Sequence, residues 1–513
     1  MKRMAVVLRL ALPLAVALLA VGTGPDGAQA ADGGADGHAA RQRIFVLSDI
    51  GNEPDDQMSL VRLLVYANAL DIEGLVATTS TWQRQTTRPD TMAALVDAYG
   101  QVRPNLLKHA DGWPAAAALK ALVSSGPSAY GMAAIRPDAP SPGARRLIEA
   151  ADRRDERPLW ISLWGGANTL AEALASVRAT RTPAELAAFV ARLRVYSISD
   201  QDDAGPWIRR EFPGLFYIVQ PSSADAADYA RATWTGISGD NYYRNGDGAD
   251  GATVTNQWLD ANIRSKGPLG QHYPRFLFIM EGDTPAFLNL LPNGLEGYRH
   301  PAWGGWGGRY VFRQPYGETR PIWTQGGDLF TRVTSADTVA GVDGKPRSSD
   351  QASIWRWRTA FQHDFAARMD WTYKPYKQAN HHPTVVVNGR RGVGAVEADL
   401  VAGESLVMDA SGTSDPDGDG LSYSWFHYGE AGGPPGATAG AGLADIAIEA
   451  DGGKATVKAI ATCRPQWLDT GPCPATGFAH VILAVTDKGA PSLTSYRRIV
   501  LRVRNREASG TTP

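Results

Sequence analysis

The chain has 513 residues, which is long enough for two or three compact domains with buried cores. Its 51 lysine and arginine residues balance 53 aspartate and glutamate residues, leaving a net charge of -2. After the amino-terminal segment, no run of basic residues is longer than two. The sequence therefore excludes nucleic acid and an anionic membrane surface as expected partners.

The amino-terminal segment is typical of a secretory signal peptide. Two basic residues precede an apolar run over residues 5–21, and small residues near Ala30 mark a cleavage site. We therefore predict a signal peptide at residues 1–30 and a spacer at 31–41. Because no later stretch is long and apolar enough to span a bilayer, we expect a secreted or periplasmic protein without a membrane span.

Residues 42–374 alternate strands and helices in the way that is typical of a doubly wound α/β domain. A strand at 43–48, a helix at 56–69 and a strand at 72–77 form the first βαβ unit. Further strands are predicted at 158–163, 194–199, 216–219 and 275–280, and further helices at 168–177 and 351–369. In such a mainly parallel sheet, ligands bind beyond the carboxyl ends of the strands.

Residues 384–505 change to short strands separated by glycine, proline and aspartate turns. Six or seven such strands predict an all-β immunoglobulin-like sandwich, which we expect to fold on its own. Cys463 and Cys473 lie close in sequence with no histidine nearby, which favours a disulfide over a metal site. The turn at 415–419 resembles those of cadherin-like and polycystic-kidney-disease-type modules. Its three aspartates fit either a calcium ion or a solvated turn.

The loop after the first strand carries the strongest chemical signal. Four carboxylates fall within eight residues: Asp49, Glu53, Asp55 and Asp56. Like charges this close raise each other's pKa unless a cation intervenes, and calcium binds through such oxygen ligands. The alternative is that the acids cap the following helix, but capping requires one acid and the loop supplies four. The loop therefore predicts a bound calcium ion.

This loop and several later segments resemble the nucleoside hydrolases. In that family one strand ends in Asp-x-Asp-x-x-x-Asp-Asp and a second ends in a threonine pair, which is Thr78-Thr79 here. The resemblance implies that calcium is bound by Asp56, Asp283 and the backbone carbonyl of Trp164. The remaining acids of the loop would share the base and hydroxyl-binding roles and form the catalytic set: Asp49, Glu53 and Asp55.

Two positions depart from the nucleoside hydrolases. The family's third-position aspartate, a metal ligand and presumed base, is Gly51 here. The histidine that protonates a purine leaving group in some members falls at Gly282. The chain is more similar, over residues 42–505, to a secreted nucleoside-hydrolase-like family that is described as cellulose-binding. The segments that carry this similarity are the acidic loop, Trp-Gly-Gly-Ala-Asn at 164–168, Glu-Gly-Asp-Thr-Pro at 281–285 and Gly-Gly-Trp-Gly-Gly-Arg-Tyr at 304–310.

Other polar or aromatic residues near the expected pocket are candidates for substrate binding: Asn52, Gln83, Asn168, Asp200, Glu281 and Trp306. Asn52 or Glu53 is a candidate to replace the missing ligand, and Glu281 to supply an acid. We expect a secreted, calcium-dependent hydrolase that cleaves a carbohydrate or glycoside. The alternative is a non-catalytic carbohydrate-binding protein with a degenerate active site. The sequence predicts no oligomeric state.

Overall fold

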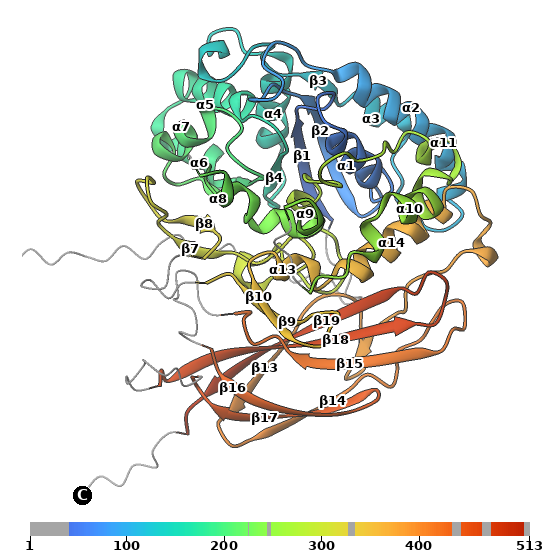
Figure 1. Ribbon diagram of the computed structural model, residues 1–513. Helices are drawn as coiled ribbons and strands as arrows, with labels where there is room; N and C mark the ends of the chain where they lie inside the picture. The colour runs from blue at the N-terminus through green and yellow to red at the C-terminus, as the bar shows by residue number, and fades with distance from the viewer. Residues whose placement is uncertain are drawn as a thin grey trace, which may run out of the picture.

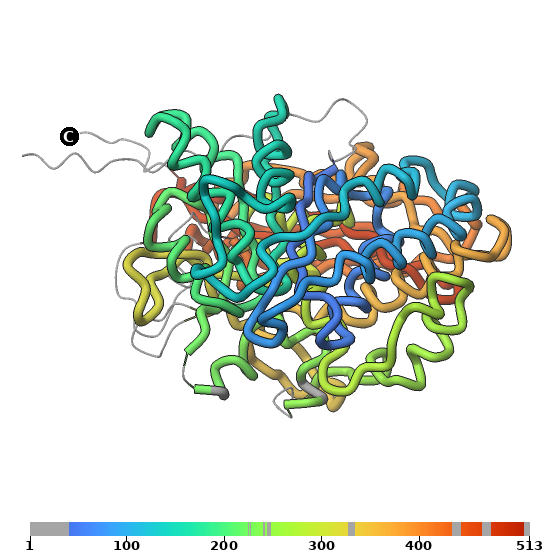
Figure 2. Tube along the Cα trace, turned by 90° about the horizontal axis from the view of Figure 1, so that it is seen from above, coloured from blue at the N-terminus to red at the C-terminus, as the bar shows by residue number. Residues whose placement is uncertain are grey.

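The computed structural model describes residues 41–223, 225–243, 248–326, 334–432, 443–463 and 473–506. The predicted signal peptide, and the spacer apart from its last residue, lie outside these ranges. The chain forms an α/β part that lies above a β part in Figure 1, and Figure 2 looks down on the α/β part. Within the described ranges, no helix combines the length and apolar character that crossing a bilayer requires.

The α/β part is built on one eight-stranded sheet in the order β3-β2-β1-β4-β5-β6-β8-β7. Neighbouring strands run parallel except at the edge, where β7 pairs antiparallel with β8. This confirms the predicted mainly parallel sheet. The strands are β1 Gln42–Ser48, β2 Leu70–Ala77, β3 Val123–Ser125, β4 Leu159–Leu163, β5 Leu193–Ser197, β6 Phe216–Ile218, β7 Val311–Arg313 and β8 Ile322–Thr324.

Helices cover both faces of this sheet (Figure 1). Side chains alternate along a strand, so Ile44 and Val46 of β1 join the core under α1, α2 and α14. Phe45 and Leu47 join a second core under α4, α5, α6 and α7. The helices are α1 Pro54–Leu64, α2 Pro89–Leu106, α3 Ala116–Lys120, α4 Pro142–Asp152, α5 Asn168–Thr180, α6 Pro183–Ala191, α7 Ala204–Glu211, α8 Ala226–Ala230, α9 Gly239–Tyr243, α10 Asn256–Leu259, α11 Gly267–Gly270, α12 Pro285–Leu288, α13 Ala352–Trp355 and α14 Arg358–Asp370.

Two predicted elements differ in the structure. Residues 275–280 form no strand, and β8 occupies the position beside β6. The apolar run misled the prediction because Leu277 and Phe278 lie at the surface, with 74% and 47% exposure. The helix predicted at 351–369 is divided into α13 and α14, because the backbone of Trp357 between them leaves the helical conformation.

The β part consists of two sheets, in the orders β13-β19-β18-β15 and β14-β17-β16. Alternate residues of the strands, among them Trp425, Val457 and Leu483, fill the core between them. The structure joins Cys463 to Cys473, as the spacing predicts. The immunoglobulin-like classification stays a prediction. The strands are β13 Val396–Val401, β14 Ser405–Asp409, β15 Leu421–His427, β16 Asp445–Asp451, β17 Lys454–Ala461, β18 Thr476–Asp487 and β19 Thr494–Arg504, and the two-residue strands β11 Val386–Val387 and β12 Arg390–Arg391 form a separate pair.

The acidic turn before β15 is ordered by its own hydrogen bonds. One Asp415 carboxylate oxygen accepts from the amides of Asp417 at 2.9 Å and Asp419 at 3.1 Å. The Asp417 carboxylate accepts from the amide of His381 at 2.7 Å. These bonds join the turn to the segment that leads out of the α/β part. Asp415 Oδ2 is buried without a hydrogen-bond partner among the described residues, so the calcium ion and the solvated turn both stay predictions.

The β part and the α/β part share one apolar core. Val481 and Leu483 of β18 face the inside of the sandwich, whereas Ile482 between them packs in the main α/β core. Tyr496 packs there as well, with its ring centroid 6.3 Å from that of Trp306 and 5.4 Å from that of Trp357. The four-stranded sheet is therefore covered on both faces. This argues against the expectation that the β part folds on its own.

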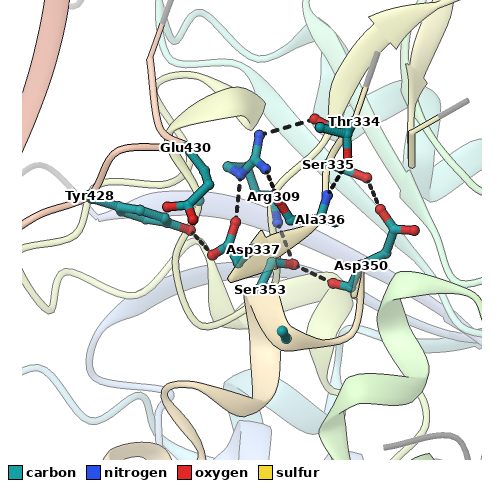
Figure 3. A network of polar contacts seen from close by, with 12 residues as sticks. Arg309, Thr334, Ser335, Ala336, Asp337, Asp350, Ser353, Tyr428 and Glu430 are labelled. Atoms are coloured by element: carbon teal, nitrogen blue, oxygen red, sulfur yellow. Dashed lines mark hydrogen bonds and ion pairs between the residues drawn. The ribbon is translucent and has the colours of Figure 1, made fainter. Parts of the chain in front are cut away.

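A buried polar network crosses the same interface (Figure 3). Asp337, at the start of the hairpin strand β9 (Asp337–Ala340, paired with β10 Pro346–Ser349), is fully buried. Its carboxylate accepts hydrogen bonds from Arg309 at 2.8 Å, from Arg356 at 2.8 Å and, across the interface, from the Tyr428 hydroxyl at 2.6 Å. Although burial opposes it, the charge of the two arginines lowers the pKa of Asp337. The ionised carboxylate thus ties the two parts together.

Candidate active site

The candidate site lies where the strand order of the sheet reverses, between β1 and β4. Parallel sheets bind ligands at such a switch point, beyond the carboxyl ends of the strands. Asp49 directly follows β1, and its carboxylate is held by the hydroxyl of Ser80, which follows β2. A Cβ atom at Gly165, beyond β4, would lie 2.7 Å from Asp49 Oδ1. Only glycine at 165 therefore leaves room for this carboxylate.

The acidic loop continues directly into α1. Pro54 begins the helix, and Asp55 and Asp56 occupy its first turn, where the helix dipole favours negative charge. Glu53 is the capping residue, but its side chain makes no capping hydrogen bond. Asp56 accepts a hydrogen bond of 2.5 Å from the hydroxyl of Ser48. Capping therefore does not explain why the loop carries four acids.

Asp283 reaches the same place from a distant part of the chain. It lies just before α12 and is 3% exposed, and its Oδ2 atom is buried without a hydrogen-bond partner in the part of the chain that the structure describes. One oxygen each of Asp55, Asp56 and Asp283 lie within 4.8 Å of one another. The structure thus brings together the two distant carboxylates that the resemblance assigns to one ion, with Asp55 as a third member.

The charge of this cluster is not balanced by the arginines around it. Arg62 of α1 pairs with Glu281 at 2.5 Å, and Arg88 pairs with Asp90 at 2.9 Å. Burial, followed by the charge of Glu53, raises the pKa of Asp49 to about 6 even though Ser80 opposes the shift. Burial and the charges of Glu53 and Asp49 raise the pKa of Asp55 to about 7.

The two deepest members of the cluster are perturbed most. Burial, together with the charges of Asp49 and Asp55, raises the pKa of Asp56 well above its ordinary value. Burial and the charges of Asp56 and Asp55 do the same for the pKa of Asp283. Such a cluster is stable at neutral pH only when protons or a cation neutralise it. Oxygen ligands of this kind suit a hard divalent cation such as calcium.

The structure shows little room for a side chain at Gly51 and Gly282, the two positions where the sequence departs from the nucleoside hydrolases. Gly51 has φ +112°, and a Cβ atom there would lie 2.8 Å from the Arg88 side chain. This loop conformation therefore disfavours the carboxylate that nucleoside hydrolases carry at this position. A Cβ atom at Gly282 would lie 2.8 Å from Asp55 Oδ2 and 3.2 Å from the Trp234 ring. The space above Gly282 is thus filled by Asp55 and Trp234.

Two substrate-binding candidates, Gln83 and Asn168, and the predicted metal ligand Trp164 make hydrogen bonds within the loops that follow the strand ends. The Gln83 amide donates to the backbone carbonyls of Asp49 at 3.1 Å and Ile50 at 3.3 Å, which fixes the acidic loop. The Asn168 amide group donates to Thr79 at 2.9 Å and is completely buried. The Trp164 carbonyl accepts a hydrogen bond of 2.5 Å from Gln201, so one of its two lone pairs is used.

The side chains of three other substrate-binding candidates are occupied by contacts within the protein, which corrects the expectation that they bind substrate. Asp200 forms a two-bond ion pair with Arg209, at 2.7 and 2.9 Å. The fully buried Glu281 pairs with Arg62 and accepts from the Tyr273 hydroxyl at 2.6 Å. Trp306 is 1% exposed within the core that the two parts share. Of the remaining candidates, Glu53 is partly buried beside the cluster and Asn52 is exposed at the surface.

Sequence reasoning missed Ser48, Ser80 and Trp234. The two serines lie at or just after the carboxyl ends of β1 and β2, where site residues are expected. Serine is common at strand ends, so this position alone did not identify them. Trp234 lies in a short 3-10 helix at Thr233–Ile237, and nothing in the spacing around it points to the acidic loop. Its contact with Gly282 depends on the path of the chain between β6 and β8.

Comparison with known families gives two matches. The family model described as "Cellulose-binding Sde182, nucleoside hydrolase-like domain" matches residues 43–310. The model described as "Cellulose-binding protein Sde0182, C-terminal domain" matches residues 405–503. Comparison with proteins of curated function gives no match.

A solved structure from Saccharophagus degradans is similar over nearly the whole chain. It is described as a nucleoside hydrolase-related hypothetical protein that is associated with carbohydrate metabolism. It is 35% identical, with a TM-score of 0.72, and the match covers 91% of this chain and 100% of that chain. A PKD domain matches 23% of this chain and 87% of its own length at 21% identity, but its TM-score of 0.15 supports no conclusion. The chain therefore belongs to the cellulose-binding Sde182 family, which carries a nucleoside-hydrolase-like domain.

Proposed function

We propose that this protein is a calcium-dependent hydrolase that cleaves a carbohydrate or glycoside at the acid cluster. The observation that carries the proposal is the convergence of Asp55, Asp56 and Asp283 within 4.8 Å. The two arginines near the loop are paired with other acids. A buried group of like charges is costly, so a site built this way needs protons or a cation to be stable at neutral pH, and its oxygen ligands suit a hard divalent cation.

The residues present fit a calcium ion. Asp283 Oδ2 is buried without a partner among the described residues, and the Trp164 carbonyl has a lone pair beyond the one that Gln201 uses. Asp56, Asp283 and the Trp164 carbonyl would hold the ion, and Asp55 lies close enough to join them. When bound, a calcium ion supplies charge that favours ionised groups and orients sugar hydroxyls.

The remaining acids of the loop supply proton transfer. A general base must be fixed at the site and able to take a proton; Asp49 is buried at the end of β1, and without a cation burial raises its pKa to about 6. Ser80 fixes the direction of this carboxylate. Burial also raises the pKa of Glu53, whose side chain is free of capping bonds. In this proposal one of them accepts the proton of a water that attacks an anomeric carbon, and the other gives a proton to the departing oxygen as the glycosidic bond breaks. Asp55 binds sugar hydroxyls.

The expected substrate is a glycoside rather than a purine nucleoside. Gly282 places no acid beside a purine leaving group, and the space above it is filled by Asp55 and Trp234. A glycoside with a good leaving group does not need such an acid. The matching family is described as cellulose-binding, which supports a glucan as the carbohydrate.

One observation favours a second candidate, a carbohydrate-binding protein without catalysis. Gly51 replaces the family's presumed base, and its φ of +112° with Arg88 nearby keeps a side chain out of that position. If Asp49 and Glu53 do not take over the proton transfer, the site still binds a cation and sugar hydroxyls. The two candidates share every binding residue and differ only in turnover.

The deciding experiment measures reducing sugar released from cello-oligosaccharides, and aryl alcohol from a panel of aryl glycosides, with added calcium and with chelator. Wild type should release product only with calcium, and Asp49→Asn should lower kcat while it keeps bound calcium. A wild type that binds calcium and oligosaccharide but releases nothing from any substrate supports the binding protein instead.

A further inference from the structure

A pair of aromatic rings lies exposed on the α/β part. Tyr242, in α9, and Phe278 are each 47% exposed, and their ring centroids lie 5.4 Å apart at an angle of 73°. Leu277, next to Phe278, is 74% exposed. We call these three side chains the aromatic platform. Single exposed apolar residues are normal on protein surfaces, but two rings in contact beside an exposed leucine form a patch.

The platform is held in place by the backbone that leads to the acid cluster. The Ser238 hydroxyl accepts from the Met280 amide and bonds to the Met280 carbonyl, both at 2.9 Å. Ser238 directly precedes α9, and Met280 lies between Phe278 and Asp283 in the chain. These two bonds tie the segment that carries Tyr242 to the segment that carries Phe278 and the cluster acid Asp283.

The platform is also continuous with the cluster through side chains. Tyr242 packs against Tyr243, with ring centroids 4.9 Å apart. Tyr243 packs against the apolar core that contains Trp234. Tyr229 packs edge-on against Trp234 at 5.2 Å, and the Trp234 ring and Asp55 Oδ2 both lie within 3.2 Å of the Cβ position at Gly282. Aromatic residues thus extend from the acid cluster to the surface.

We propose that the aromatic platform binds a sugar unit of a glucan chain whose neighbouring unit occupies the acid cluster. This inference rests on the proposed function only in placing a sugar at the cluster. An aromatic face buries the C–H face of a pyranose ring, while the ring's hydroxyls stay free for polar partners. Five acids gather in and around the cluster, and their excess over the charge of one calcium ion disfavours an anionic lipid or nucleic acid at the same place. A neutral, hydroxyl-rich chain can contact both the aromatic platform and the acid cluster.

The binding test uses the full-length protein in the presence of chelator, so that metal and turnover do not contribute. Cellohexaose affinity is measured by calorimetry for wild type, Tyr242→Ala, Phe278→Ala and the double variant. Tyr316→Ala is the matched control, because Tyr316 is fully exposed and lies outside the platform. Each single platform change should weaken binding about 2- to 10-fold, and the control should not. Tyr242→Trp should retain affinity, because it keeps a stacking face.

A second measurement separates the platform from the acid cluster. Asp56→Asn, which the proposed function expects to be inactive, should still bind cellohexaose through the platform. If wild type is inactive but Tyr242→Ala and Phe278→Ala lose affinity, the proposed hydrolysis fails and the platform stands. Unchanged cellohexaose affinity in the double variant, with its melting temperature also unchanged, would overturn the platform. Equal losses for cellohexaose and for a single-sugar aryl glycoside would overturn it too.

Discussion

Asp56 and Asp283 lie more than two hundred positions apart in the sequence, yet the structure brings their carboxylate oxygens within 4.8 Å of each other. Among the residues that the structure describes, neither is paired with a cationic side chain, and their neighbours Asp49 and Asp55 add further negative charge. Charge repulsion within a buried group opposes folding unless something neutralises it. The contact between these two acids is therefore the best place to test the proposed site.

Removing the charge of either acid should remove the ion. In Asp56→Asn and Asp283→Asn an amide oxygen replaces a carboxylate oxygen, so the site loses a unit of charge. Calcium affinity should fall by at least about tenfold, since even changes to residues outside the ligand set cost that much. Asp97→Asn is the control, because Asp97 is an exposed residue paired with Lys120. Calcium content equal to wild type in both cluster variants would contradict the shared site.

Calcium should stabilise the fold more strongly as the pH rises. The pKa values of Asp49 and Asp55 are raised to about 6 and about 7, from an ordinary value of 3.8. Between pH 4 and 7, the folded calcium-free chain therefore holds protons that the unfolded chain has released. Since the folded state binds more protons than the unfolded state, the contribution of these acids to the free energy of unfolding falls as the pH rises through this window.

Bound calcium should offset this loss, because it neutralises the same acids. We expect the melting temperatures of metal-stripped and calcium-saturated protein to be similar near pH 4.5 and to differ by several degrees above pH 7. Scanning calorimetry at a series of pH values measures this difference. A difference that stays constant with pH would show that calcium binds elsewhere.

Replacing Gly51 should be costly for two separable reasons. Alanine at this position must adopt a φ near +112°, and its Cβ atom would lie 2.8 Å from Arg88 Cγ. We expect Gly51→Ala to lower the free energy of unfolding by about 1–3 kcal/mol. Gly317→Ala is the matched control, since Gly317 has φ +85° but nothing within 4 Å of its Cβ position. Adding Arg88→Ala to Gly51→Ala should recover only the part of the lost stability that the contact with Arg88 causes. No recovery in that double variant would exclude the contact as a cause.

The interface network should make a large contribution to the stability of the whole chain. Asp337→Ala leaves Arg309 and Arg356 without their shared carboxylate, which should cost about 3–5 kcal/mol. Tyr428→Phe removes one hydrogen bond to an ionised group and should cost about 1.5–3 kcal/mol. Urea unfolding of the full-length protein measures both, with Asp343→Asn as an exposed control. Wild-type stability in Asp337→Ala would show that the network does not tie the two parts together.

Local sequence pattern determined much of the fold. Apolar runs that end in polar residues located five of the eight strands of the main sheet, because a strand buried on both faces is apolar throughout. The same pattern failed at 275–280, where Leu277 and Phe278 are apolar but exposed. Exposure depends on what the rest of the chain places beside a segment, and no local pattern contains that information.

The candidate site also combines features that can be seen in the sequence with features that only the tertiary structure decides. The crowding of Asp49, Asp55 and Asp56 can be seen in the sequence, because these residues lie in one loop. Asp283 was found only through family resemblance, and Glu281, two positions earlier, proved to face Arg62. Tertiary structure alone decided which of these neighbouring acids joins the cluster, because the packing of α1 places Arg62 against Glu281 and Asp55 and Asp56 against Asp283. It also decided the position of the aromatic platform, which joins two segments that have no common sequence signal.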